Sequence, residues 1–206
     1  MYHFDATALS AADQYKFLSG SIIPRPIAWI TTQNAKDRSV NLAPFSFFTG
    51  LSNQLPLVSV AILRRGDQPK DTAANLMAWP QGVIHLVSHR NIQAMNQSAA
   101  SLAPGQSEVT ELALPTVTSQ KVAVPGLADA LIRLEVSVYQ YVPVKAPAGQ
   151  VMTDLFILRI EAFHFADSVF DPTTRYLNVA AFDPVARLAG PTYAHLGDTY
   201  TLKRPR

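Results

Sequence analysis

Apolar positions along this chain follow the two-residue alternation of β-strands more often than the spacing of helices. Six stretches have this strand character, and in the fifth of them apolar residues alternate with polar ones such as Glu135. They cover residues 27–33, 40–49, 57–63, 83–88, 131–142 and 152–165. The stretch 57–63 is almost continuously apolar, which predicts that both of its faces are covered, as in a barrel or a sandwich.

Three short segments carry helix signals instead. In residues 8–19, Ser10 followed three residues later by Asp13 resembles a capping box. A second helix is predicted to begin with Asp71 as its N-cap and to end at residue 79, and a third to cover 91–100. No alternation of strand and helix and no glycine-rich turn marks a dinucleotide-binding unit. We therefore expect a mainly β protein, an antiparallel barrel with short helices at its rim.

Residues 101–126 lack any periodicity and are rich in Pro, Gly, Ser and Thr. A segment of this length inside a compact domain is usually a lid, a binding loop or a mobile region. We expect residues 101–111 to be its most mobile part.

The composition limits the class of protein. The chain has 206 residues, 48% of them hydrophobic, which is enough for one domain over residues 1–206 with a full core. Cysteine is absent, which excludes disulfides and thiolate chemistry and favours a reducing, cytoplasmic location. No apolar run reaches the ~20 residues of a membrane helix, and the net charge of +2 comes without a basic run interleaved with aromatic residues. We expect neither a membrane nor a nucleic-acid partner.

The five histidines form no HExxH or HxH pattern. His85 and His89 are four residues apart, but a predicted strand ends between them, so we do not expect them to bind one ion together. The sequence therefore predicts no metal site.

The tripeptide Lys70-Asp71-Thr72 opens the second predicted helix. A helix N-terminus offers free N–H groups, and an ammonium and a hydroxyl beside it suit a phosphate. The plainer alternative is that Asp71 only caps the helix and Lys70 is only solvated. Arg25 lies between two prolines, which hold its backbone extended and aim the guanidinium in one direction.

A second group of small and polar residues interrupts the apolar stretch 40–49. Asn41, Ala43, Pro44 and Ser46 would let a flat heterocycle approach the backbone and would offer amide and hydroxyl groups to it. The alternative is a strand edge at which proline prevents aggregation. The chain has no motif that pairs a nucleophile with a base, as expected where a cofactor does the chemistry.

Four separated motifs, in the same order along the chain, resemble the flavin reductase-like, FMN-binding split-barrel family, including its flavoredoxin-type members. They are residues 21–29 (SIIPRPIAW), residues 41–48 (NLAPFSFF), Lys70-Asp71-Thr72 with Asn75, and residues 187–190 (RLAG) with Tyr193. The match extends from about residue 9 to residue 205. The chain departs from the family pattern at Ala189, where glycine is common, and at Glu108-Val109 and 113–115, which bear on the choice of electron donor and acceptor.

The resemblance implies a six-stranded antiparallel split β-barrel, a homodimer and one FMN per subunit near the dimer interface. It assigns phosphate or ribityl oxygens to Arg25, Lys70 and Thr72. It places Thr31, Asn41, Ala43 and Ser46 along the isoalloxazine edge, with Phe48 flanking the ring. Arg187 and Tyr193 would close the pocket from the C-terminal segment.

Three functions remain open at this point. The first is a flavin reductase that takes hydride from NAD(P)H onto FMN and passes electrons to an acceptor. The second is a flavoredoxin-like electron carrier that exchanges electrons with a redox protein partner. The third is a non-catalytic FMN-binding module. A nicotinamide can bind by stacking on flavin with few protein contacts, so the absence of a nicotinamide motif does not separate them.

Overall fold

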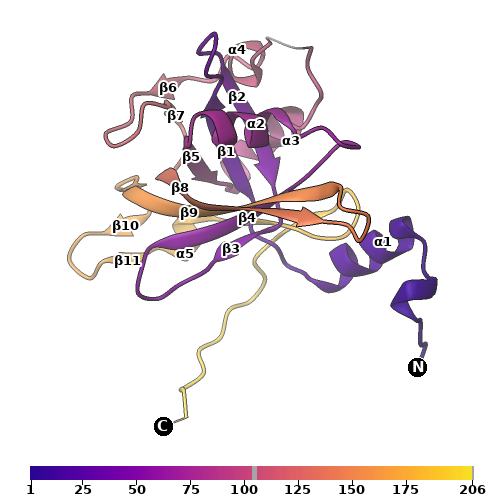
Figure 1. Cartoon of the computed structure of the whole chain (residues 1–206). Helices are drawn as coiled ribbons and strands as arrows, with labels where there is room; N and C mark the ends of the chain where they lie inside the picture. Colours follow the sequence, from indigo (N-terminus) through magenta and orange to yellow (C-terminus); the bar gives the residue numbers. More distant parts are fainter. Residues whose placement is uncertain (104–105, 206) are drawn as a thin grey trace.

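The computed structural model describes residues 1–103 and 106–205. Within them, one curled antiparallel sheet has the strand order β2-β1-β5-β8-β9-β4-β3 (Figure 1). Its strands are β1 (Ala28–Gln33), β2 (Val40–Phe45), β3 (Phe48–Gly50), β4 (Leu57–Leu63), β5 (Gln81–Leu86), β8 (Ile132–Lys145) and β9 (Val151–Phe165). The fold is mainly β, as predicted, and the sheet forms a half-barrel.

The sheet has seven strands in the described part of the chain, not six, because the stretch 40–49 is divided. β2 and β3 follow each other in sequence but lie at opposite ends of the strand order. The chain changes partner at Phe47, whose carbonyl accepts the N–H of Ala61 in β4 at 2.9 Å. β2 also contacts β4, so this crossing joins the two edges of the curled sheet.

The main hydrophobic core is built from side chains of β1, β4, β5, β8, β9 and α2. Its fully buried members include Ile30, Val60, Ile62, Ile84, Val136, Phe156 and Leu158. In β4 the buried residues alternate with half-buried ones. The prediction that both faces of 57–63 are covered was therefore wrong for one face, which is only half-covered.

A second core cluster contains Trp29, Leu42 and Met95. Trp29 is buried, and its indole N–H donates to the Ser98 hydroxyl at 2.8 Å. This bond ties β1 to the end of α3 (Ile92–Gln97).

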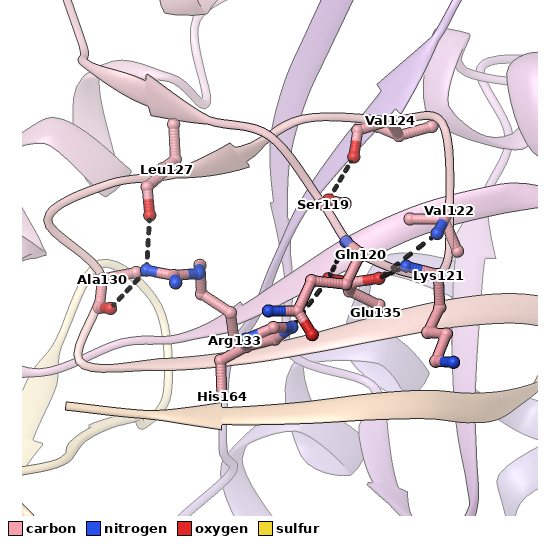
Figure 2. A network of polar contacts seen from close by, with 10 residues as sticks. All are labelled: Ser119, Gln120, Lys121, Val122, Val124, Leu127, Ala130, Arg133, Glu135 and His164. Carbon is pink, nitrogen blue, oxygen red and sulfur yellow. Dashed lines mark hydrogen bonds and ion pairs between the residues drawn. The ribbon is translucent and has the colours of Figure 1, made fainter.

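A buried carboxylate ties the irregular segment before β8 to the sheet (Figure 2). Glu135 accepts the backbone N–H groups of Gln120 (2.8 Å), Lys121 (2.5 Å) and Val122 (3.2 Å), and its Oε1 lies 2.6 Å from Nε2 of His164. Burial alone would raise the pKa of Glu135, but these hydrogen bonds outweigh it and hold that pKa below its usual range. Glu135 is thus one of the polar residues that the alternation predicted, and the loop of residues 120–122 covers its carboxylate.

Residues 106–126 have more regular structure than predicted. It contains α4 (Glu108–Glu111) and a small sheet of β6 (Thr116–Val117) and β7 (Gly126–Leu127). The buried Glu108 carboxylate accepts the N–H of Leu42 at 2.9 Å, which holds α4 against β2. The second half of the stretch 101–111 thus has regular structure, its mobility stays a prediction, and residues 104–105 lie outside the described residues.

Helix α1 (Ala11–Ser21) begins as predicted, with Ser10 accepting the N–H of Asp13 at 3.1 Å. Helix α2 (Asp71–Ala78) packs on β1 and β2, but Lys70 is its N-cap and Asp71 its first helical residue. The prediction of Asp71 as the cap was wrong by one position, and Asp71 acts on the helix through its charge instead. Figure 1 shows α1 and both chain ends standing away from the barrel.

The remaining elements are short. They are η1 (Ala6–Ala8), η2 (His89–Asn91), β10 (Phe170–Asp171), β11 (Tyr176–Leu177), α5 (Val179–Phe182), β12 (Val185–Arg187) and β13 (Tyr193–His195). Among the described residues, no helix has the length and apolarity needed to cross a membrane.

Candidate functional site

Two adjoining pockets share part of their lining at the end of β2. The larger, of about 400 Å³, is lined by Arg25, Ser46, Arg187 and Tyr193 among others, and is called the arginine pocket here. The smaller, of about 230 Å³, is lined by Asn41, Ala43, Lys70 and Thr72 among others, and is called the lysine pocket. Pro44, Phe45 and Ala99 line both. The two pockets therefore adjoin along the end of β2, and together they are called the groove here.

The lysine pocket contains the N-terminus of α2. The N–H groups of Asp71, Thr72 and Ala73 donate to no other described residue, and Lys70 provides no side-chain cap. The Lys70 ammonium lies 5.8 Å from the centroid of the Phe45 ring. Partial burial lowers the pKa of Lys70, and the nearby Arg65 lowers it further. This end of the groove is a cationic site with free backbone donors.

Two acidic residues also line the lysine pocket, Asp71 and Glu108. The Glu108 carboxylate is engaged by the N–H of Leu42. Asp71 lies in the first turn of α2, where its charge is favourable to the helix. The cations Lys70 and Arg65 face the open groove without a carboxylate within salt-bridge distance among the described residues.

A side-chain network holds β2 against α2 beneath the lysine pocket. The Asn41 amide donates to the Thr72 hydroxyl at 2.8 Å, and the Asn75 amide donates to the Thr32 hydroxyl at 3.1 Å. Thr72 is buried, so its hydroxyl also has a structural use: it accepts from Asn41 and keeps its own proton for another acceptor.

Arg25 lies in the arginine pocket, apart from Lys70 and Thr72 with which the resemblance grouped it. Its guanidinium donates to the carbonyls of Ser19 and Ile22 at the end of α1, and to the Leu188 carbonyl at 2.9 Å. A further N–H points to the Ser46 hydroxyl at 3.4 Å. A cation is favourable at a helix C-terminus. Most of the Arg25 donors are therefore occupied by the protein itself, and phosphate binding by Arg25 does not fit this arrangement.

Arg187 and Tyr193 form the C-terminal wall of the arginine pocket. They are paired across β12 and β13, and the guanidinium stands 4.6 Å from the centroid of the Tyr193 ring and donates to its hydroxyl. The Tyr193 hydroxyl donates to the Asn96 side chain at 3.2 Å. Arg25 and Arg187 exchange backbone hydrogen bonds of 3.1 and 2.9 Å, which attach this wall to the rest of the barrel.

The structure brings eight of the ten predicted site residues to the groove, and two stand elsewhere. Thr31 is buried in β1, and its hydroxyl donates to the Pro125 carbonyl at 2.8 Å, away from both pockets. Phe48 begins β3 and packs against the main core. The structure therefore does not bring these two side chains to the pockets, and their contact with a ring stays a prediction of the resemblance.

Sequence reasoning missed several lining residues. Arg65 follows β4 and faces the lysine pocket, and Tyr15 and Ser19 of α1 reach the arginine pocket. Met95 and Ala99 also line the arginine pocket. Their spacing of four residues is a stripe on the third predicted helix, but such a stripe is usual for packing and does not by itself indicate a ligand.

Comparisons with known proteins agree with this geometry. Residues 19–183 match the family described as Flavin reductase like domain. YwrF of Bacillus subtilis (strain 168) is 40% identical over 205 residues, covering 100% of both chains. The crystal structure of nitrilotriacetate monooxygenase component B from Bacillus cereus is 33% identical, with a TM-score of 0.94 and 98% of both chains covered. The 2-nitrobenzoate 2-nitroreductase NbaA of Pseudomonas fluorescens is 26% identical, with a TM-score of 0.88 over 99% of this chain and 96% of that chain. The resemblance is confirmed, and the chain belongs to the flavin reductase-like family.

Proposed function

We propose that this protein is an FMN-binding oxidoreductase, a flavin reductase that oxidises NAD(P)H and passes the electrons to a separate acceptor. The observation that carries the proposal is the two-part groove, in which a cationic helix N-terminus opens along β2 into a larger and less polar pocket. A phosphate monoester linked to a flat heterocycle has these two parts.

Lys70 and the free N–H groups at the start of α2 suit the phosphate. The pKa of Lys70 is lowered in the absence of an anion, and a phosphate beside it would offset the loss of hydration and the repulsion from Arg65. Each charge-assisted hydrogen bond contributes roughly 1.5–3 kcal/mol. Arg25 supports the pocket by holding α1 and the C-terminal segment together.

The ring system would lie along Ala43–Ser46, where the two pockets meet. Pockets of about 400 and about 230 Å³ are within the usual range for cofactor sites. Small side chains at Ala43 and Ser46 allow close approach, and Tyr193 bounds the far side. Bound there, FMN would supply the hydride and electron transfer, and the chain would supply binding and orientation. The names of the two similar structures, a monooxygenase component and a nitroreductase, are compatible with such an oxidoreductase.

A homodimer belongs to the same proposal. The N-terminal segment exposes large apolar side chains on and beside α1, a helix that stands away from the barrel (Figure 1). Among them are Tyr15, Phe17 and Leu18 on the helix and Phe4, Ile22 and Ile23 outside it, with exposed fractions of 39–58%. Tyr15 also lines the arginine pocket, so a second subunit that covers α1 would complete the cofactor site.

The phosphate assignment is tested by titrating apo-protein with FMN and with riboflavin while following flavin fluorescence. FMN should bind more tightly, and Lys70→Gln should weaken FMN binding by about 10- to 100-fold without changing riboflavin binding. Lys36→Gln, in the exposed turn between β1 and β2, is the matched control and should change neither. Equal affinities for the two flavins in the wild type would contradict the assignment.

The reaction is tested by mixing the FMN-loaded protein anaerobically with NADH or NADPH. Rapid bleaching of the oxidised flavin supports the reductase and identifies the preferred nicotinamide. Bleaching only by a reduced protein donor would indicate an electron carrier, and no bleaching by either would indicate a non-catalytic module.

The assembly is tested by light scattering, which should give about twice the chain mass of 22.5 kDa. A monomer that retains FMN in a one-to-one ratio would contradict the homodimer and the role given to α1.

A further inference from the structure

Three metal-ligating side chains meet outside the two pockets. They are His89 at the start of η2, Asp183 directly after α5, and His195 at the end of β13. One ligand atom from each lies within 4.8 Å of the others. Nδ1 of His195 lies 2.9 Å from Oδ1 of Asp183, and the centroids of the two imidazole rings are 4.6 Å apart.

Backbone hydrogen bonds hold these three positions together, although the side chains are exposed. The His89 N–H donates to the Asp183 carbonyl at 3.0 Å, and Ser88 forms a β-bridge with Pro184. His195 is paired with Val185 across β12 and β13. The ligand-bearing segments are thus fixed relative to one another before any ion binds, which reduces the ordering that binding requires.

We propose that His89, Asp183 and His195 form a binding site for a divalent transition-metal ion, with Zn²⁺ as the probe. Two imidazoles and one carboxylate are a donor set that such ions prefer. Zinc binds these donors at roughly 2.0–2.2 Å, which brings ligand atoms of a tetrahedral site to about 3.3 Å from one another. The ligand atoms lie within 4.8 Å of one another in the structure. Rotation of the exposed side chains would bring them to the shorter spacing of a zinc site. Three protein ligands leave a coordination position open to water or another small ligand.

His85 takes no part in this site, despite lying four residues from His89. It is fully buried, and both of its ring nitrogens are engaged, with the Trp29 carbonyl at 2.7 Å and the Leu127 N–H at 2.9 Å. The three proposed ligands are far apart in the sequence, so they form no short ligation motif that sequence reading could detect.

The site has a consequence for the arginine pocket. Residues two apart on a strand face the same side, so Tyr193 and His195 share one face of the β12–β13 hairpin. Tyr193 meets Asn96 of α3 on that face, and His195 meets His89 of η2. An ion bound by His195 and His89 would therefore fasten to the barrel the same hairpin that carries the wall of Arg187 and Tyr193.

The test is isothermal titration calorimetry of Zn²⁺ into the full chain without an affinity tag, holding its flavin and freed of metal by a chelator. We expect one saturable site per chain. His89→Gln and His195→Gln should each weaken it about tenfold or more. Asp183 has a φ of 47°, a conformation that asparagine tolerates, so Asp183→Asn should weaken binding without disturbing the backbone. His3→Gln, an exposed histidine elsewhere, is the matched control and should leave the affinity unchanged.

Thermal unfolding gives a second readout that does not depend on the enzyme's activity. Zn²⁺ should raise the melting temperature of the wild type, because an ion that binds only the folded state stabilises it. It should not raise that of the double variant His89→Gln/His195→Gln. The absence of saturable binding to the wild type, or an affinity that both histidine substitutions leave unchanged, would overturn the proposal.

Discussion

Lowering the pH should destabilise the fold through His85, a fully buried residue of β5. Its Nδ1 lies 2.7 Å from the Trp29 carbonyl, to which it must donate, and its Nε2 accepts the N–H of Leu127 at 2.9 Å. These two bonds select the neutral tautomer with the proton on Nδ1. Burial lowers the pKa of His85 from 6.5 to about 3; the hydrogen bond to Trp29 opposes this shift, and the charge of Arg133 adds to it.

The size of the effect follows from linkage between protonation and folding. In the unfolded chain His85 takes up a proton as the pH falls through 6.5, whereas in the folded chain it stays neutral until about 3. The unfolded state therefore binds more protons over this interval, and the free energy of unfolding decreases as the pH falls. Between pH 7 and pH 5 the loss from this residue alone is about 2 kcal/mol.

Urea unfolding at pH 7 and at pH 5, at constant ionic strength, measures this loss. His85→Gln should be less stable than the wild type at pH 7, because it leaves one buried hydrogen bond unmade. Its further loss between the two pH values should be smaller than the wild type's by about 2 kcal/mol, since the other titrating groups are common to both. Equal losses in the two proteins would refute the argument. An NMR titration of the folded wild type should show the His85 ring unprotonated throughout this range.

Three further changes test the packing around the sheet by urea unfolding. Glu135→Gln removes the charge that three N–H groups and His164 share, so it should cost about 2–4 kcal/mol near neutral pH; because the folded pKa of Glu135 is lowered, the difference from the wild type should shrink as the pH falls below the ordinary value of 4.5. Gly82→Ala would place a Cβ 2.9 Å from a carbonyl oxygen of β1 and should cost about 1–3 kcal/mol, whereas Gly50→Ala meets nothing within 4 Å and should stay close to the wild type. Asp154→Asn breaks a buried pair with Arg64, whose guanidinium donates to both carboxylate oxygens at 2.8–3.1 Å, and should cost about 3–5 kcal/mol.

The local pattern was sufficient to predict where strands occur, because alternation and β-branched residues act within a few positions. All six predicted stretches contain strands of the sheet. The pattern was not sufficient at 40–49, where Ser46 alone separates Phe45 from Phe47 and Phe48 and the stretch was predicted as one strand. The change of strand partner at Phe47 depends on β4, and that partner is chosen by closure of the curled sheet and not by neighbouring residues.

The candidate site shows the same division. The resemblance brought together residues from four motifs that no local pattern connects, including Lys70 and Tyr193. It did not reveal that Arg25 is occupied by carbonyl groups of α1 and of the C-terminal segment, since that depends on where those segments pack. Nor does the resemblance show that His89 lies next to His195, because His195 is positioned by the pairing of β12 with β13.

The position of the groove follows from how the open edge of β2 is covered. Of the strands in the sheet, β2 pairs only with β1, so alternate residues turn their backbone groups outward. The carbonyl of Val40 accepts from the Ser107 hydroxyl and the N–H of Leu42 donates to Glu108, so the segment of α4 covers the first half of this edge. The next outward residue is Pro44, which has no N–H to donate.

At Pro44 the edge of β2 therefore offers a carbonyl acceptor but no N–H donor, and Pro44 lines both pockets. Another strand cannot extend the sheet there, because it would find no N–H at Pro44. A ligand whose ring donates a hydrogen bond loses nothing by the missing N–H and can use the carbonyl group that remains. The two interpretations of Pro44, edge protection and ligand contact, are thus compatible, and Pro44→Ala should leave the barrel folded, as urea unfolding would measure.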